Sequence, residues 1–178
     1  MMLIRVRSVR MRKNSYGIYD ILGKERVERL AKIIEKVTGE KLDRPIKGIG
    51  DYRSLTVIEP LVWMLAERTI LSFKIKLIQD EFTSLEEHLL VKKVKSANKK
   101  FSANLNMLNY AIYFRIPLKE LDEISDQEIE RNIRAMLWAA REFLRELRKR
   151  ELSRYGGVGL SEDSLRLLER LNGAVIGS

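Results

Sequence analysis

The chain has 178 residues, the size of one compact domain or of one domain with a small appendage. Hydrophobic residues make up 45% and charged residues 33% of it, a composition typical of globular rather than disordered proteins. The absence of cysteine and the presence of a single histidine exclude thiol chemistry, disulfides, zinc clusters and any metal site with two histidines.

The net charge of +9 indicates a polyanionic partner, with nucleic acid first and an anionic membrane surface second. Two segments without any acidic residue hold this excess: residues 1–15 carry five basic side chains and residues 88–119 carry seven. The rest of the chain is close to neutral. We therefore expect two basic patches on a neutral scaffold rather than a uniformly basic surface.

The first basic segment alternates apolar and basic residues over residues 4–7 and again over 9–12. A period of two predicts a strand, with a bulge at Ser8 and arginines on its open face. Such a strand needs a partner, and the candidates are residues 18–21 and residues 44–53.

Apolar residues at helical spacing begin at Lys24, and Gly39 is placed to end that helix. Pro60 suits the first turn of a long buried core helix that we expect to reach about Phe82. A capping-box pattern begins at Thr83 and predicts a further helix.

The helix that begins at Thr83 is expected to end near Lys95. Residues 96–104 are typical of a basic polar connector, which leads into a helix over about 105–114. Pro117 ends that helix, because the residue before a proline disfavours helical backbone angles.

The strongest helical pattern follows a capping box at Ser125 and continues until Gly156. Leucines at helical spacing from Ser161 onwards predict a last helix. The sequence therefore predicts a mainly α fold, a bundle of five to six helices that allows a small N-terminal β element. We expect residues 1–22 to form a basic strand or appendage and residues 23–178 a single helical domain.

The long helix after Ser125 carries a sector of arginines, and Trp138 lies inside that sector rather than among the apolar residues. An exposed indole among guanidinium groups is typical of single-stranded nucleic-acid binding, where arginine contacts phosphates and the ring stacks on a base. Two alternatives stay open beside this one. The arginines could pair with neighbouring glutamates as an ordinary solvated face, and Trp138 could dock against another helix.

In the second acid-free segment, Phe101 follows two lysines, with asparagines and tyrosines close by. Basic residues with interleaved aromatic rings fit neutralisation of a phosphate backbone plus stacking on bases, although Phe101 fits equally well as a core anchor for a loop. The candidate nucleic-acid-binding residues are Arg5, Arg7, Arg10, Arg12, Lys13, Lys92, Lys93, Lys95, Lys99, Lys100, Phe101, Arg134, Trp138, Arg141 and Arg145.

Groups for catalysis are scarce. His88 is the only histidine, and the sequence places no second ligand or catalytic partner beside it. The glycine-rich stretches near Gly48 and Gly156 lack the Lys-Ser/Thr of a phosphate-binding loop. We expect no catalytic residue, no metal site and no cofactor.

These observations favour a non-enzymatic, nucleic-acid-binding helical subunit of a larger nucleoprotein complex, with single-stranded RNA or DNA and other protein subunits as partners. In size, helicity and charge the chain is similar, at the level of class, to the small helical subunits of archaeal CRISPR effector complexes, which implies a role in antiviral defence. The alternative is a protein-interaction adaptor, in which Val62, Trp63 and Met64 dock a partner and the basic segments serve only solubility.

The absence of a secretory or membrane-spanning pattern predicts a cytoplasmic protein without a membrane partner. Residue usage rich in Lys, Arg, Glu and Ile and poor in glutamine is typical of a thermophile.

Overall fold

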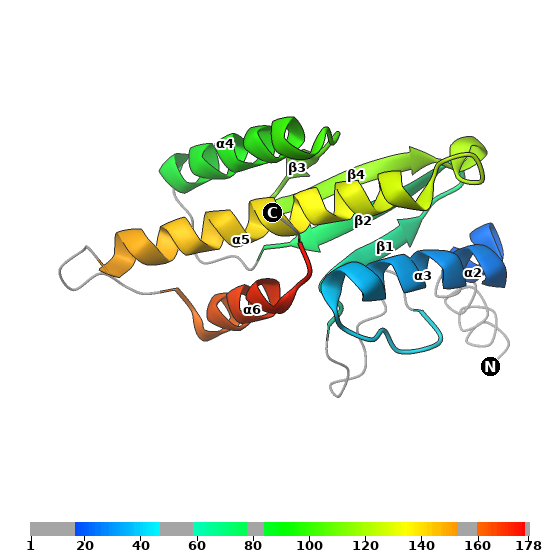
Figure 1. Ribbon diagram of the computed structural model, residues 1–178, viewed down its shortest axis with the longest axis horizontal. Helices are drawn as coiled ribbons and strands as arrows, with labels where there is room; N and C mark the ends of the chain where they lie inside the picture. The colour runs from blue at the N-terminus through cyan, green and yellow to red at the C-terminus, as the bar shows by residue number, and fades with distance from the viewer. Residues whose placement is uncertain (1–16, 47–58, 78–83, 153–159, 177–178) are drawn as a thin grey trace, which may run out of the picture.

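The computed structural model describes residues 17–46, 59–77, 84–152 and 160–176 of the chain. In these residues five α-helices and a four-stranded antiparallel sheet form two layers (Figure 1). The predicted mainly helical bundle is therefore wrong, and the fold is mixed α and β. The predicted N-terminal strand lies outside the described residues, so the expected boundary at residue 22 stays a prediction.

The elements in chain order are α2 (Gly17–Leu22), α3 (Lys24–Thr38), β1 (Trp63–Ala66), β2 (Ile70–Lys76), α4 (Ser84–Phe101), β3 (Asn106–Leu108), β4 (Ala111–Pro117), a 3₁₀ turn (Leu118–Glu120), α5 (Asp126–Leu152) and α6 (Glu162–Gly173). In the sheet the strands lie in the order β1-β2-β4-β3. Residues 18–21, a candidate partner for the N-terminal strand, belong to helix α2 instead.

The long core helix predicted from Pro60 to Phe82 is wrong, because its described part forms the hairpin β1–β2. Along β2 the buried side chains of Leu71, Phe73 and Ile75 alternate with partly or fully exposed ones, which is the pattern of a strand with one face in the core. The turn between the two strands is exposed and is closed by a hydrogen bond from the Glu67 amide to the Ile70 carbonyl, 2.8 Å long.

The helix predicted over residues 105–114 is also wrong, since β3 and β4 pair there as a second hairpin. Its two turn residues, Asn109 and Tyr110, have φ angles of 49° and 58°. Two residues in the left-handed region make a type I′ turn, whose twist matches that of the paired strands. On β4 the side chains of Ile112, Phe114 and Ile116 are buried.

Three predicted helices are confirmed as α3, α5 and α6, and the helix predicted from Thr83 is α4. Its predicted end near Lys95 is wrong, because α4 continues through the expected connector to Phe101. Gly39 ends α3 in the left-handed conformation that glycine adopts without a steric penalty, with a φ of 74°. The Ser125 side chain accepts a hydrogen bond from the Glu128 amide at the start of α5, as its capping pattern predicts. Ser161 caps α6 in the same way.

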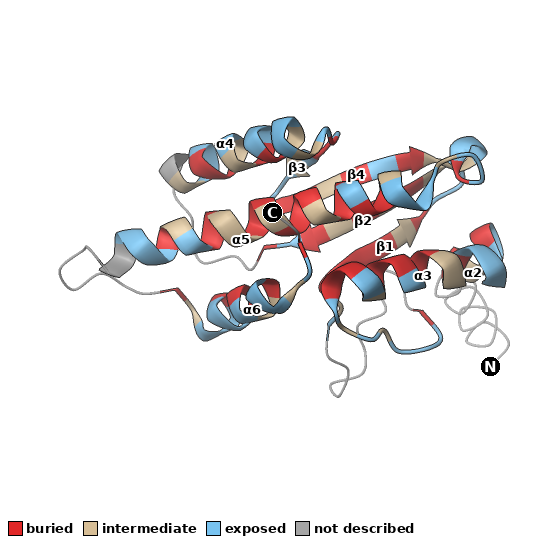
Figure 2. Ribbon diagram, in the orientation of Figure 1, coloured by how far each residue is buried: buried red, intermediate tan, exposed pale blue. Residues whose placement is uncertain are grey.

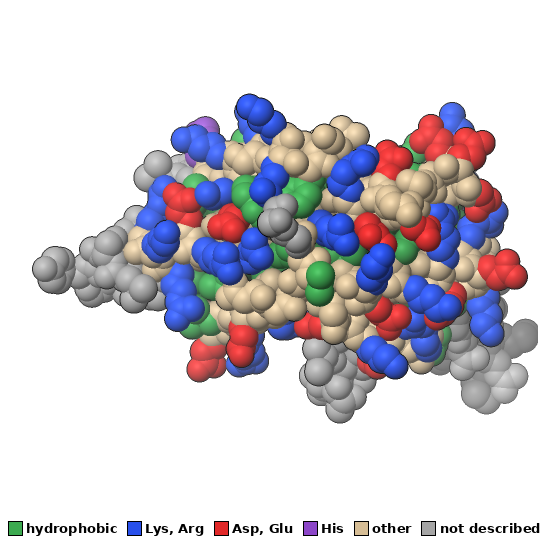
Figure 3. All heavy atoms as spheres, in the orientation of Figure 1, with side chains coloured by type: hydrophobic (Ala, Val, Ile, Leu, Met, Phe, Trp, Pro, Cys, Tyr) green, Lys and Arg blue, Asp and Glu red, His purple; other side chains and the backbone are tan. Residues whose placement is uncertain are grey.

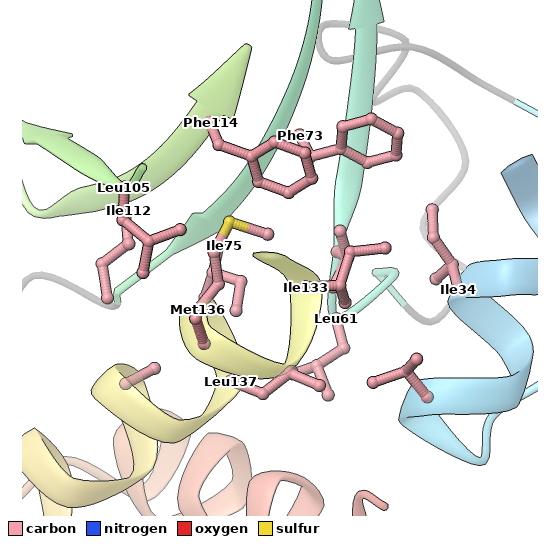
Figure 4. Packing of buried hydrophobic residues seen from close by; sticks show 14 of the residues in the cluster. Ile34, Leu61, Phe73, Ile75, Leu105, Ile112, Phe114, Ile133, Met136 and Leu137 are labelled. Atoms are coloured by element: carbon pink, nitrogen blue, oxygen red, sulfur yellow. The ribbon is translucent and has the colours of Figure 1, made fainter. Parts of the chain in front are cut away.

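The core lies between the sheet and α5, which runs across it (Figures 1 and 2). Phe73 and Phe114 are cross-strand partners on the inner face of the sheet, and their rings stack with centroids 4.7 Å apart. Ile133 and Met136 of α5 approach them from the helical layer (Figure 4). The large area of apolar surface buried there is the main force that holds the two layers together.

Charged side chains fix α3 against its surroundings. Arg26 of α3 makes two hydrogen bonds to Asp122, of 2.8 and 2.7 Å, just before α5 begins. In the loop after α3, Arg44 donates to the carboxylates of Glu28 and Glu35. These hydrogen bonds hold the pKa of both carboxyl groups below their ordinary value.

Candidate nucleic-acid interface

Helix α4 carries the predicted lysines of the second basic segment on its solvent side. Lys92, Lys95 and Lys99 are all exposed, and their spacing of three and four residues puts them on one face of the helix. We call these three residues the lysine stripe. At 1.5 Å of rise per residue the stripe is about 10 Å long. Within the described part of the chain, none of the three has an acidic partner.

The other predicted residues of α4 differ from the stripe. The Lys93 ammonium lies 2.7 Å from a Glu146 carboxylate oxygen on α5 and is neutralised there. This contact lowers the pKa of Glu146, chiefly through the hydrogen bond from Lys93. Lys100 is exposed and its ammonium lies 5.8 Å from the centroid of the Phe101 ring, within the range of a cation–π contact.

The end of α4 is fixed to the sheet by Asn98. Its side chain donates to the Leu105 carbonyl over 3.0 Å and accepts from the Leu105 amide over 2.7 Å. One residue earlier, the Asn104 amide donates to the side chain of Asn132, a buried residue of α5. Asn98, one of the asparagines noted near the basic segment, thus joins α4 to the residue before β3. The lysine stripe therefore sits on a helix with a defined position.

The arginines of α5 mostly have acidic neighbours. Arg134 lies 3.4 Å from Glu130, and Arg141 lies 3.3 Å from Glu142. Arg145 shares Glu142 and also donates two hydrogen bonds, of 3.1 and 2.7 Å, to the α6 residue Asn172. This arrangement favours the alternative of a locally paired, solvated face. Paired arginines have less charge to offer a phosphate than the lysine stripe has.

Trp138 is half-buried and packs against the core. Its ring makes an edge contact with Phe101 of α4, with centroids 6.2 Å apart and planes at 61°. Phe101 is also half-buried against the core. The two aromatic residues that the sequence offered as stacking platforms are thus brought together with each other, as the alternatives of helix docking and core anchoring describe.

The distribution of charge differs between the two ends of the molecule (Figure 3). Basic side chains gather over α4 and the C-terminal part of α5, whereas acidic and basic side chains alternate around α3 and the start of α5. The predicted residues of the N-terminal segment, Arg5, Arg7, Arg10, Arg12 and Lys13, lie outside the described residues.

A second basic surface, which the sequence did not predict, lies on the outer face of the sheet. Because side chains alternate along a strand, the residues between the buried ones of β2 and β4 point away from α5. They line a groove of about 240 Å³. Lys74, Tyr113 and Arg115 are among its lining residues, and Lys74 and Tyr113 are direct cross-strand partners.

The arginine in this groove is paired with a ring instead of an acid. The Arg115 guanidinium lies 4.7 Å from the centroid of the Tyr113 ring. Neither Arg115 nor Lys74 forms an ion pair within the described residues. A cation–π contact orients the guanidinium without neutralising it. Arg115 belongs to the second acid-free segment, and the alternation of Ile112, Tyr113 and Phe114 with it was the signal that marks a strand.

His88 is exposed on α4, and no group of three or more metal-ligating side chains occurs in the described part of the chain. Of the helices in that part, each is too short or too polar to cross a bilayer. Comparison with known protein families, curated proteins and solved structures finds no match to this chain.

Proposed function

We propose that the chain is a non-enzymatic subunit of a nucleoprotein complex and that it binds the phosphate backbone of nucleic acid through the lysine stripe. The observation that carries this proposal is the alignment of Lys92, Lys95 and Lys99 on one exposed face of α4 without acidic partners in the described residues. Three uncompensated ammonium groups in a row attract a linear polyanion, because binding releases the counterions condensed on it.

The dimensions of the stripe suit a chain of phosphates. Successive phosphates of one duplex strand advance by about 3.4 Å along the helix axis, so a stripe about 10 Å long spans roughly three of them. Asn98 fixes the end of α4, so the three lysines need little ordering of the backbone on binding. The stripe by itself suits a duplex strand as well, so the preference for single-stranded RNA or DNA comes from the sequence expectation.

The fold removes part of the support for two expectations drawn from the sequence. The similarity to small helical CRISPR subunits depended partly on helicity, and the four-stranded sheet removes that part. The adaptor alternative used Val62, Trp63 and Met64 as a docking surface, but all three are buried. The large exposed apolar side chains in the described residues are Ile21, Leu108, Leu165 and Val175.

The proposal is tested by the salt dependence of binding to a single-stranded oligonucleotide. For three phosphate contacts we expect the affinity to fall about twentyfold between about 50 and 200 mM salt. The triple variant Lys92→Gln, Lys95→Gln, Lys99→Gln should lose most of this dependence, with a slope lower by about 2 on logarithmic axes.

A matched variant separates the stripe from net charge. Lys24→Gln, Lys32→Gln, Lys41→Gln removes the same charge from exposed positions on and after α3. It should bind nearly as the original chain does. An equal loss of binding in both variants, or no binding by the original chain at low salt, would overturn the proposal.

A further inference from the structure

The groove on the outer face of the sheet has the groups that recognise bases as well as phosphates. We propose that it binds a single-stranded segment of nucleic acid, with a base stacked on the Arg115–Tyr113 pair and a phosphate held by Lys74. This inference rests on the proposed function, which it deepens by placing the bases of the bound strand.

The stacking platform follows from the geometry of β4. Tyr113 and Arg115 are two residues apart on one strand and therefore share its outer face. The guanidinium carbon of Arg115 lies 4.7 Å from the centroid of the Tyr113 ring. Planar guanidinium groups and aromatic rings are the surfaces on which unpaired bases stack. Arg115 is exposed and Tyr113 is half-buried, so the pair is in contact with solvent.

The phosphate contact comes from the neighbouring strand. Lys74 of β2 is directly opposite Tyr113, and Ser72 is directly opposite Arg115. Strands in a sheet lie about 4.8 Å apart, so the side chains of Lys74, Ser72 and Tyr113 are close neighbours on the outer face of the sheet. Lys76 adds another cation to the lining, 5.6 Å from the centroid of the Trp63 ring.

The side chains that line the groove carry a net positive charge, which favours an anionic ligand. Among the described residues that line the groove, Glu67 is the single acid, against the cations Lys74 and Arg115. This balance complements an anion. The apolar and aromatic surface between these cations, from Leu65 and Tyr113, favours an anion with flat rings over a plain carboxylate chain.

A duplex does not present its bases to such a surface, because they are stacked and paired inside the helix. A single strand can turn its bases towards the sheet while its phosphates meet the lysines. The groove therefore predicts a preference for single strands, which the lysine stripe does not by itself impose.

The experiment compares four probes of equal length, about twelve units each: oligouridylate, its abasic counterpart, a duplex, and polyglutamate. The full chain should bind oligouridylate at least tenfold tighter than the abasic strand. The abasic strand has no base to stack, and each stacked base contributes to the binding free energy. Tyr113→Leu and Arg115→Lys should reduce this ratio to about twofold, because each removes a planar group while it keeps apolar contact or charge.

The lysine-stripe variant serves as the control that separates the two proposals. Lys92→Gln, Lys95→Gln, Lys99→Gln should weaken binding of oligouridylate and the abasic strand by the same factor and leave their ratio unchanged. Circular dichroism checks that each variant is folded.

Three outcomes would overturn the inference and leave the proposed function intact. They are equal binding of the abasic strand and oligouridylate, a ratio unchanged by both Tyr113→Leu and Arg115→Lys in folded proteins, or a preference for the duplex. Binding of polyglutamate as tight as that of oligouridylate would indicate an acidic protein partner and overturn both. If the lysine-stripe variant kept the full salt dependence of the original chain, with the ratio preserved, the proposed function would be overturned and the groove supported.

Discussion

Replacement of Trp138 and Phe101, singly and together, tests whether these rings hold α4 against α5 or serve as stacking platforms for a base. Both side chains are half-buried against the core, so each single change to alanine should lower the free energy of unfolding by about 2 kcal/mol, less than the 3–5 kcal/mol typical of a fully buried ring. The two rings meet edge to face at 6.2 Å, and such pairs contribute about 0.5–1.5 kcal/mol beyond their burial. We expect the double variant to be less destabilised than the sum of the singles by about that amount.

The assay is equilibrium unfolding in urea for the four proteins, with the oligouridylate affinity measured under native conditions. A control cycle pairs Trp138 with Ile21 on α2, a helix that packs mainly on α3 and β1. That pair should be additive within about 0.5 kcal/mol. A coupling near zero between Trp138 and Phe101, together with a tenfold loss of oligonucleotide affinity in folded Trp138→Ala, would refute the structural role and restore the ring as a stacking platform.

Two further predictions concern the scaffold. Gly39→Ala should destabilise the fold by about 1–2 kcal/mol, because alanine is strained at a φ of 74°. Gly173→Ala on α6, where an added methyl group meets no atom within 4 Å, should be stabilising by up to about 1 kcal/mol. Thermal melts of the two variants measure both effects, and equal shifts in melting temperature would contradict the prediction. Arg44 lowers the pKa of Glu28 and Glu35, so its contribution to stability should be full above their ordinary value of 4.5 and should vanish as the pH falls through the lowered values. The difference in melting temperature between the original chain and Arg44→Met should thus be larger at about pH 6 than at about pH 3. The opposite trend would show that Arg44 does not form these hydrogen bonds to Glu28 and Glu35.

The sequence predicted the helices whose apolar stripes and caps are complete and missed the strands. In α5 and α6 the caps at Ser125 and Ser161 agree with the apolar period, so local and global preferences coincide. The run from Leu61 to Ala66 is apolar on consecutive positions, and periodicity by itself does not separate a buried strand from a buried helix there. Pro60 before it then suggested a helix start.

The second hairpin was hidden for a different reason. Its turn is Asn109-Tyr110, and a tyrosine in the left-handed region is uncommon for a residue other than glycine. Without a glycine there, the apolar residues 105–114 matched a short helix as well as two strands. The alternation along β2 from Leu71 to Lys76 was the stronger signal, and it was absorbed into the long helix.

The two basic surfaces differ in how far a sequence reveals them. The lysine stripe was predicted only in part: the acid-free run marked its members as basic, but Lys99 was expected in a connector, whereas α4 continues to Phe101. The groove depends on the register between β2 and β4, which brings Lys74 opposite Tyr113 from nearly forty positions away. Register is set by tertiary contacts of the whole sheet, so no local pattern predicts that pair.

The two hydrogen bonds between the Asn98 side chain and the Leu105 backbone make the Leu105 amide informative in hydrogen-exchange measurements. The acceptor of the Leu105 amide is a side-chain oxygen of Asn98, so this amide becomes free to exchange when one side chain rotates, without unfolding of α4 or β3. It lies at the joint between the helix with the lysine stripe and the hairpin whose second strand lines the groove. The protection factor of this amide therefore reports whether nucleic acid bound at the lysine stripe or in the groove stabilises the connection between the two surfaces.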